Sequence, residues 1–233
     1  MTDKKRRMIN HLLLRKMIIY WMMKNRILLW LTLLVFTSPA MATNNNAVQA
    51  RKLFDHTYNM VFGTQGSTLH YNVNLVGIMK IDGTIWYKGK KSRFEESRYL
   101  SWNDGVKDYW VDKKKKVVTL YDANSVKKDK YSSKFTFNAE DYNYALSDSD
   151  EGFVVTLNAK KNVKGIKHLK AVIHKKTLAP ISMKIKVLWF WTTVNISQFR
   201  SGNISDDLFV FPAEKYKSYA FVDERGKANV KKR

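Results

Sequence analysis

The sequence predicts a mainly β protein with one or two helices and a strongly curved antiparallel sheet. Two observations lead to this prediction. Short segments along most of the chain alternate apolar or aromatic residues with polar ones, which is typical of strands that cover a core with one face. The alternating segments are not separated by long helical patterns, which argues against a parallel sheet.

One amphipathic helix is expected before the strands. Between Ala47 and Phe62, apolar groups that include Phe54 and Tyr58 recur at helical spacing, and Gly63 follows as a stop signal. A helix with one apolar stripe can cover a sheet as ordinary core packing. Over a hollow sheet, the same stripe would line a cavity.

The clearest strand pattern lies in residues 81–122. Apolar and polar residues alternate in short runs there, after a long expected strand from Thr68 to Lys80. The Asp-Gly dipeptides at 82–83 and 104–105 predict tight hairpin turns, because both residue types tolerate positive φ angles. The segment therefore predicts an antiparallel meander.

The strand pattern resumes in the second half of the chain. Residues 135–146 predict a short helix or lid segment, and strands are expected over 153–158, 168–175, 181–191, 192–200 and 208–211. In the third of these strands, alternate apolar residues share one expected face: Ile181, Met183, Ile185, Val187, Trp189 and Trp191. The total comes to about nine or ten strands.

The first 42 residues predict a signal peptide. Lys24 and Arg26 precede an apolar run from Ile27 to Phe36, and Ala40-Met41-Ala42 follows with the small-residue pattern of a signal-peptidase site. The apolar run of about ten residues is too short for a permanent span of a bilayer about 30 Å thick. We therefore expect export and cleavage after Ala42, with an N-terminal membrane anchor as the alternative and a true start at Met22 or Met23 as a further possibility.

Charge and composition limit the function classes. The 233 residues carry a net charge of +22, and removal of residues 1–42, with eight basic residues and one acidic residue, leaves 34 basic and 19 acidic residues, or +15. Lysines on wet strand faces explain much of this charge, and attraction to anionic membrane surfaces or acidic proteins is a second interpretation. Trp86 to Phe94 interleaves aromatic and basic residues as in nucleic-acid sites, but export argues against that partner.

No catalytic or metal-binding pattern is present in the sequence. Nucleophile-elbow, zinc-protease and nucleotide-binding motifs are missing, Cys is absent, and the five His are scattered without ligand-like grouping. We therefore expect no enzyme, no cofactor and no metal, and a fold without disulfides.

Residues 81–122 contain in order a Gly-x-Ile-Trp strand at 83–86, a basic loop, a strand centred on Phe94 and an Asp-Gly hairpin with aromatic residues after it. This succession resembles the central block of LolA, the outer-membrane lipoprotein carrier family. A helix before the meander and the Phe-x-Phe-Pro ending at 209–212 agree in order. The resemblance covers roughly residues 47–219 and implies one LolA-like half-barrel domain at 43–223, in which the strongly curved sheet forms an incomplete, half-open barrel covered by a helical lid. The lysine-rich composition at the end of the chain predicts a flexible basic tail at 224–233.

The resemblance implies a periplasmic carrier that shields the acyl chains of lipoproteins and transfers them from the inner to the outer membrane. Its expected partners are acylated lipoproteins, an inner-membrane lipoprotein-releasing transporter and an outer-membrane acceptor, with transient contact to membrane surfaces, no nucleic acid and a monomeric state. In this family a basic residue in the loop after the Gly-x-Leu-Trp strand influences the lid, and Lys90 is the candidate here. The loop is longer in this chain and lacks the family's proline.

The aromatic surplus of the sheet supports a hollow interior, because one or two short helices do not fill a long concave sheet. Packing in a large core would explain any single aromatic residue equally well. The candidate residues of an acyl-chain cavity are Phe54, Tyr58, Trp86, Phe94, Trp102, Tyr109, Val118, Leu120, Met183, Ile185, Val187, Trp189 and Trp191. The alternative function is a lipid-sensing or protein-interaction module on the same half-barrel, with a regulatory role in the envelope.

Overall fold

The computed structural model of the chain describes residues 45–75, 79–125, 137–163, 165–187 and 190–226, and the predicted signal peptide and residues 227–233 lie outside them. The first half consists of the helix α2 (Asn45–Phe62) and the strands β1 (Ser67–Leu75), β2 (Met79–Lys88), β3 (Lys91–Glu96), β4 (Tyr99–Asn103), β5 (Lys107–Asp112) and β6 (Val117–Asp122). The second half consists of η3 (Ala139–Asp141), β7 (Tyr142–Asp148), β8 (Phe153–Ala159), β9 (His168–Ile173), β10 (Pro180–Val187), β11 (Phe190–Ser201), η4 (Asp206–Phe209), η5 (Ala213–Tyr216) and β12 (Ala220–Asp223), where η denotes a 3-10 helix.

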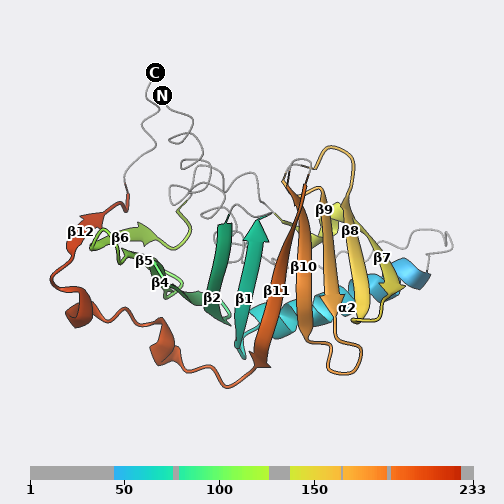
Figure 1. Cartoon of the computed structure of the whole chain (residues 1–233), viewed down its shortest axis with the longest axis horizontal. Coiled ribbons are helices and arrows are strands. Elements are labelled where there is room, and N and C mark those ends of the chain that lie inside the picture. Colours follow the sequence, from blue (N-terminus) through green and yellow to red (C-terminus); the bar gives the residue numbers. More distant parts are fainter. Residues whose placement is uncertain (1–44, 76–78, 126–136, 164, 188–189, 227–233) are drawn as a thin grey trace, which may run out of the picture.

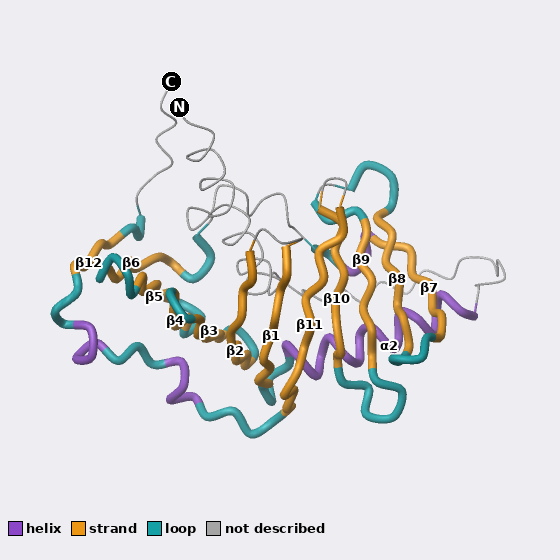
Figure 2. The backbone as a smooth tube through the Cα atoms, viewed as in Figure 1, coloured by secondary structure: helices purple, strands orange, loops and turns teal. Residues whose placement is uncertain are grey.

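All twelve strands belong to one sheet with the order β12-β6-β5-β4-β3-β2-β1-β11-β10-β9-β8-β7. Neighbouring strands are antiparallel except β12 and β6, which are parallel. β12 and β7 are the two edges, so the sheet does not close into a barrel, and Figure 2 shows it as one curved layer with α2 lying across part of it. The expected fold class, a mainly β protein with an open antiparallel sheet and a covering helix, is confirmed.

α2 forms where the helical stripe predicts it. Ala50, Phe54, Thr57 and Val61 are its buried residues, three and four positions apart, so one stripe faces the sheet. The helix ends at Phe62, and the N–H of the next residue, Gly63, donates to the carbonyl of Asn59 at 2.8 Å. A side chain at position 63 would collide with that carbonyl, because an added Cβ would lie 2.4 Å from its oxygen.

The two Asp-Gly dipeptides have different roles. Asp104-Gly105 makes the predicted turn between β4 and β5, with Gly105 at a φ of 95°. Gly83 lies inside β2, so the turn predicted there is wrong. An added Cβ at Gly83 would lie 2.8 Å from the hydroxyl oxygen of Tyr71 and 2.7 Å from the carbonyl of Glu95, so this glycine makes room for side chains on the neighbouring strands.

Three other predicted elements differ from the structure. The described part of the expected lid segment, 137–146, contains η3 and the first residues of the edge strand β7, because the alternating residues of Tyr142–Asp148 pair with β8. The strand expected at 208–211 does not form, since Leu208 and Phe209 are the last residues of η4, which begins after the N-cap Ser205. The long strand expected at 181–191 is nearly all of β10 and the first two residues of β11, paired as a hairpin with Val187 opposite Phe190.

The sheet has two hydrophobic cores on opposite faces. The larger core lies between α2 and one face, and it includes Phe54, Leu69, Leu157 and Val194. The smaller core lies on the other face of β4, β5 and β6, where Leu100, Trp102, Val111 and Val118 pack against Tyr216 and Phe211. Residues 202–223 therefore cover the second core as a C-terminal strap, which Figure 1 shows running past this half of the sheet.

Candidate functional site

A cavity of about 100 Å³ lies between α2 and the sheet. The helix contributes Phe54, Thr57, Tyr58, Val61 and Phe62 to its wall. The sheet side and the segment before η3 contribute Leu69, Tyr87, Phe137, Leu169, Ala171, Ile173, Pro180, Ser182, Met183, Val194 and Ile196. Apart from Thr57 and Ser182, the lining residues present hydrocarbon or aromatic groups, so the cavity suits an apolar ligand.

Hydrogen bonds hold α2 at both of its ends. Near the start, the side-chain amide of Asn46 donates to the carbonyl of Leu146 at 2.8 Å and accepts from the Leu146 N–H at 2.8 Å. At the end, the hydroxyl of Ser67 donates to the carbonyl of Val61 at 2.6 Å, and the hydroxyl of Ser201 donates to that of Met60 at 3.1 Å. The helix thus bridges the sheet from β7 to β1 and β11, with the cavity beneath it.

Aromatic rings fill most of the space under the helix. Tyr58 lies between Phe54 and Phe62, with ring centroids 6.0 Å and 4.6 Å away. Phe137 contacts Phe54 at 5.8 Å, and Phe62 reaches the ring of Tyr87 at 4.7 Å in an edge-on arrangement. We call Phe54, Tyr58, Phe62 and Phe137 the ring cluster. Rings in such tilted contacts pack favourably, and all four rings line this side of the cavity.

Charged groups on the outer side of α2 connect the helix to η3. The guanidinium of Arg51 donates to Glu140 and to Asp55, both at 2.7 Å. The hydrogen bond from Arg51 is the main reason why the pKa of Glu140 is lowered. The Arg51 guanidinium also lies 5.2 Å from the ring centroid of Tyr144, which packs against Phe54 from β7. Arg51 therefore ties the rim of the ring cluster to the edge of the sheet.

Five of the thirteen candidate cavity residues lie in or beside this cavity. Phe54, Tyr58 and Met183 line it directly. Phe94 and Ile185 are buried in the same core on the same face of the sheet without lining the cavity. Phe94 is the register partner of Ile85, which is paired with the lining residue Leu69, and Ile185 follows the lining residue Met183 by two positions on β10, so both point to the cavity side.

Five other candidates lie on the opposite face and do not line the cavity. Trp102 and Tyr109 are register partners, and Phe211 of the C-terminal strap stacks on Tyr109 with ring centroids 4.3 Å apart. Trp86 is partly buried on the same face, with the guanidinium of Arg93 between it and Trp102 at 4.8 Å and 5.3 Å. The buried residues Val118 and Leu120 complete this group. The reason is parity, since neighbours along a strand point to opposite faces and Phe94 faces the cavity side.

The hairpin between β10 and β11 places Trp191 on a different strand from Met183. Trp191 lies in β11 opposite Lys186, on the face away from α2, and its side chain is 40% exposed. Val187 is the last residue of β10, and Trp189 and the side chain of Val187 lie outside the described residues. The expected common face from Ile181 to Trp191 is therefore broken by a reversal of the chain.

Lys90 is exposed in the two-residue turn between β2 and β3. Its neighbours Lys88 and Lys91 pair with Asp206 of the strap at 3.0 Å and 2.8 Å. The N–H of Gly89 donates to the carbonyl of Gly63 at 3.0 Å, so this basic turn contacts the end of α2 through its backbone. The turn therefore connects the helix to the strap.

Sequence reasoning missed most of the sheet side of the cavity. Leu169, Ala171 and Ile173 alternate along β9, while Val194 and Ile196 do so along β11, and both strands were expected. These residues do show the period-two alternation of a strand with one covered face. The sequence prediction favoured aromatic residues as cavity lining, whereas these residues are small or aliphatic. Phe62 could also have been predicted as a lining residue, because it lies one turn after Tyr58 on the predicted helix.

No metal-binding group occurs among the described residues, where no cluster of three or more His, Cys, Asp or Glu side chains could hold an ion. Over the same part of the chain, none of the helices has the length and apolar character that crossing a bilayer would require.

The comparisons with known proteins concern the fold. No protein-family model and no curated protein matches the chain. An uncharacterized conserved protein from Thermus thermophilus is similar in structure with a TM-score of 0.52 and 12% sequence identity, over 75% of this chain and 99% of that one. A LolA superfamily protein from Nitrosomonas europaea has a TM-score of 0.32 and 7% identity over 70% of this chain and 97% of that one.

The MucA/MucB complex of Pseudomonas aeruginosa has a chain with a TM-score of 0.42 and 10% identity, over 70% of this chain and 61% of that one. Of the three, the Thermus protein alone exceeds a TM-score of 0.5, and at 12% identity this likeness concerns the fold and says nothing about activity.

Proposed function

We propose that the protein is a periplasmic carrier that binds the acyl chains of lipoproteins between α2 and the sheet and carries them from the inner to the outer membrane. The observation that supports the proposal is the apolar cavity bridged by α2. Its wall combines rings from the helix with aliphatic groups from β9, β10 and β11. The transfer of hydrocarbon from water to such a wall is favourable, and the wall does not select the shape of a polar ligand.

The size of the cavity argues for a moving helix. A volume of about 100 Å³ is smaller than pockets for ligands of moderate size, which commonly measure ~300–1,000 Å³. An acyl chain would therefore have to displace the ring cluster. Because hydrogen bonds at the two ends hold α2 over the cavity, the helix can lift when those bonds open. The closed form then covers the apolar lining from water when no cargo is bound.

The energetics favour a reversible exchange. Each buried methylene contributes about 0.8 kcal/mol, so an acyl chain gains several kcal/mol in the cavity. Displacement of the ring cluster costs part of this gain, because the rings lose their contacts with one another and with Tyr87. A carrier needs this balance, since cargo that bound with the full transfer free energy would not leave for a membrane.

In this proposal the folded unit at residues 43–223 acts after removal of residues 1–42. Its partners are acylated lipoproteins, a transporter that releases them from the inner membrane and an acceptor at the outer membrane. The chain itself carries out no covalent step, in keeping with the lack of a catalytic motif in the sequence.

Binding of a fluorescent fatty-acyl probe tests the proposal. Met183→Glu places a carboxylate in the cavity wall and should weaken probe binding by tenfold or more, because a charge in an apolar site costs several kcal/mol. Thr193→Glu is the matched control, since Thr193 pairs with Lys184 on the opposite face. Circular dichroism verifies that both variants fold. Equal binding by the two variants, or no binding by the unaltered protein, would contradict the proposal.

Depletion of the protein in cells distinguishes a lipoprotein carrier from a lipid sensor. A carrier predicts that acylated proteins accumulate at the inner membrane after depletion, as measured by membrane fractionation. Normal sorting together with intact probe binding would reject carriage and leave lipid sensing as the function of the cavity.

A further inference from the structure

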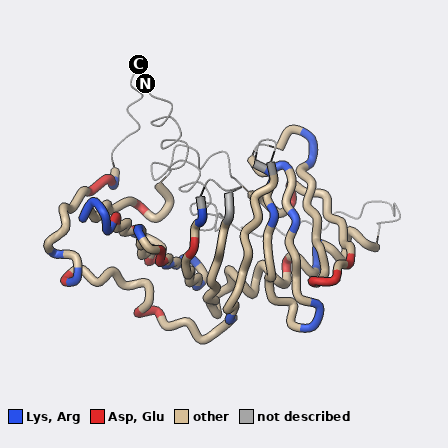
Figure 3. Tube along the Cα trace, in the orientation of Figure 1, with Lys and Arg blue, Asp and Glu red and all other residues tan. Residues whose placement is uncertain are grey.

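The face of the sheet away from α2 carries a group of basic residues beside an exposed tryptophan. Lys170 of β9 lies directly opposite Lys184 of β10, and Lys186 of β10 lies opposite Trp191 of β11. The Nζ of Lys170 lies 5.5 Å from the ring centroid of Trp191. We call Lys170, Lys184, Lys186 and Trp191 the basic face. Figure 3 shows its lysines as blue segments side by side on β9 and β10.

The lysines of the basic face lack acidic partners within the described chain. None of the three forms an ion pair there, whereas Lys88 and Lys91 share Asp206. Like charges directly opposite each other on neighbouring strands destabilise a sheet. The surrounding side chains on this face, Thr156, Thr193 and the partly buried His168, supply no negative charge. The arrangement therefore leaves positive charge available for an external anion.

Further positive charge lies at the same end of the sheet. The connection between β8 and β9 carries the exposed residues Lys160, Lys161 and Lys167, next to the start of β9. Lys160 donates to the backbone carbonyl of Glu140, so it is partly engaged with η3. Lys161 and Lys167 extend the positive field of the basic face beyond the edge of the sheet.

Trp191 indicates what kind of anion fits this face. Its indole is 40% exposed and lies among lysines, although an exposed apolar ring gains nothing from water. Tryptophan is enriched at membrane–water interfaces, where one part of the ring contacts the acyl boundary and the N–H stays wet. Lysines near an anionic bilayer each add attraction for the lipid headgroups.

From the charge and the exposed indole together, we infer that the basic face is a docking site for the surface of an anionic phospholipid bilayer. The lysines contact the headgroups and Trp191 enters the interface. The site lies on the opposite side of the sheet from α2, so docking leaves the helix and its cavity uncovered. Membrane docking and acyl-chain binding are consequently separable, and one can fail while the other remains.

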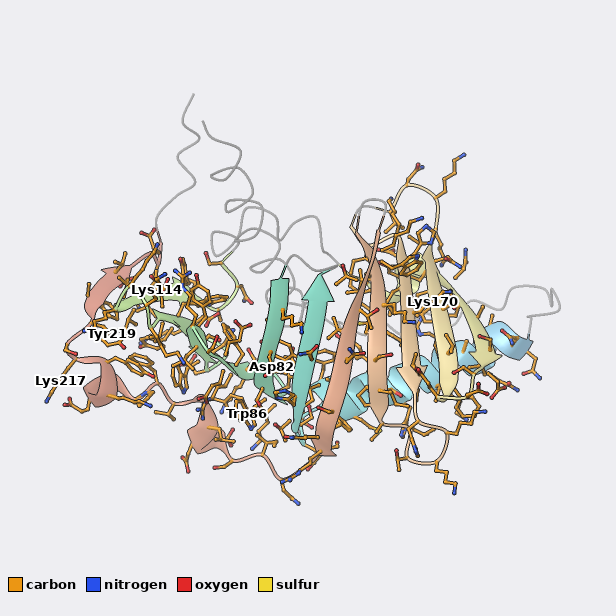
Figure 4. All side chains as sticks on the ribbon, in the orientation of Figure 1. Asp82, Trp86, Lys114, Lys170, Lys217 and Tyr219 are labelled. Atoms are coloured by element: carbon orange, nitrogen blue, oxygen red, sulfur yellow. The ribbon has the colours of Figure 1, made fainter. Side chains whose placement is uncertain are left out.

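Vesicle flotation tests the inference with the protein purified in the form that it has after export. The vesicles contain phosphatidylcholine alone or phosphatidylcholine mixed with phosphatidylglycerol. The patch variant combines Lys170→Gln, Lys184→Gln and Lys186→Gln. The matched control combines Lys114→Gln, Lys115→Gln and Lys116→Gln, which remove the same charge from the exposed turn between β5 and β6, at the other end of the sheet in Figure 4.

The unaltered protein should bind the anionic vesicles and not the vesicles of phosphatidylcholine alone. Its affinity for the anionic vesicles should fall about a hundredfold in the patch variant and much less in the control. Trp191→Ser should weaken binding without any change in charge, and added salt should weaken it in the unaltered protein. Both triple variants should bind the fatty-acyl probe as before. Melting curves verify that all variants are folded.

Any one of three results would overturn the inference: no retention of the unaltered protein by anionic vesicles, an equal loss of affinity in the two triple variants, or unchanged binding by Trp191→Ser. A further binding measurement uses polyglutamate, a soluble acidic chain, in place of the vesicles. Binding to polyglutamate through the basic face, without binding to vesicles, would assign this face to an acidic protein instead of a membrane.

Discussion

Asn46 and Leu146 are joined by two hydrogen bonds, although they are far apart in the sequence. The side-chain amide of Asn46 donates to the Leu146 carbonyl and its oxygen accepts from the Leu146 N–H, each at 2.8 Å. Asn46 thus occupies the hydrogen-bonding positions that another strand would use on β7, which is an edge of the sheet. The same pair fixes the start of the helix that covers the cavity.

Asn46→Ala should loosen this end of α2. The loss of two exposed hydrogen bonds is expected to lower the free energy of unfolding by about 1 kcal/mol and to speed release of the acyl probe, because the helix lifts more readily. Urea denaturation and stopped-flow release measure the two effects. Asn45→Ala is the control, since Asn45 contacts only Gln49 of its own helix among the contacts described. Release at the unaltered rate from Asn46→Ala would show that this end of the helix does not gate the cavity.

Glu140→Gln should change the pH dependence of stability. The hydrogen bond from Arg51 lowers the pKa of Glu140 below its ordinary value of 4.5. A lowered pKa in the folded state means that ionised Glu140 stabilises the fold above pH 4.5, and that this contribution is lost as the pH falls through the folded pKa. The melting temperatures of Glu140→Gln and the unaltered protein should therefore differ at neutral pH and converge in acid.

Glu151→Gln is the control for that experiment, because Glu151 is exposed in the turn between β7 and β8. A difference between Glu140→Gln and the unaltered protein that stayed constant in acid would mean that the Arg51 contact is not what the substitution removes.

Phe62→Ala should change stability and affinity in opposite directions. Its half-buried ring packs on Tyr58 and Tyr87 at the cavity wall, so its loss should cost about 2 kcal/mol of stability. The same change enlarges the cavity and leaves less of the ring cluster to displace, so the acyl probe should bind more tightly. Phe209→Ala, in a buried position outside the cavity, should destabilise the protein without that gain. Weaker probe binding by Phe62→Ala would mean that the ring contributes to the ligand site.

Phe211→Ala should release the C-terminal strap without an effect on the cavity. Phe211 stacks on Tyr109 and also contacts Trp102 and Tyr216 at 5.5 Å and 5.6 Å. Its loss should lower stability by about 2–3 kcal/mol and expose residues 202–223 to proteolysis. Probe affinity should stay the same, because these rings lie on the face opposite α2. A loss of affinity in the folded variant would mean that the two faces are coupled.

The sequence was sufficient for the class of fold and for α2, because hydrophobic periodicity depends on local spacing alone. Alternation reveals that a strand has two faces, but it does not say which face is covered. Trp102 and Met183 both looked like lining residues, but strand parity relative to Phe94 directs Trp102 to the opposite face, where the C-terminal strap covers it. The strap could not be foreseen, since β12 pairs with β6 in parallel through a long connection.

Gly83 and the β10–β11 hairpin illustrate a second limit. Asp82-Gly83 has the composition of a turn, yet the glycine is required by the side chain of Tyr71 on the neighbouring strand. The hairpin before Phe190 lies in an apolar stretch without Gly, Pro, Asn or Asp, so turn chemistry gave no sign of it. Both features depend on contacts between strands, which a single sequence does not contain.

Because the two cores lie on opposite faces of the sheet, one can open to water while the other stays covered. In the proposed carrier, α2 lifts and exposes the first core, while Trp102, Tyr109 and their neighbours stay covered by the strap. Amide hydrogen exchange should then separate into an early-opening set around the helix and a late-opening set in β4 to β6. The half of the sheet under the strap can thus act as a fixed frame against which the covering helix moves.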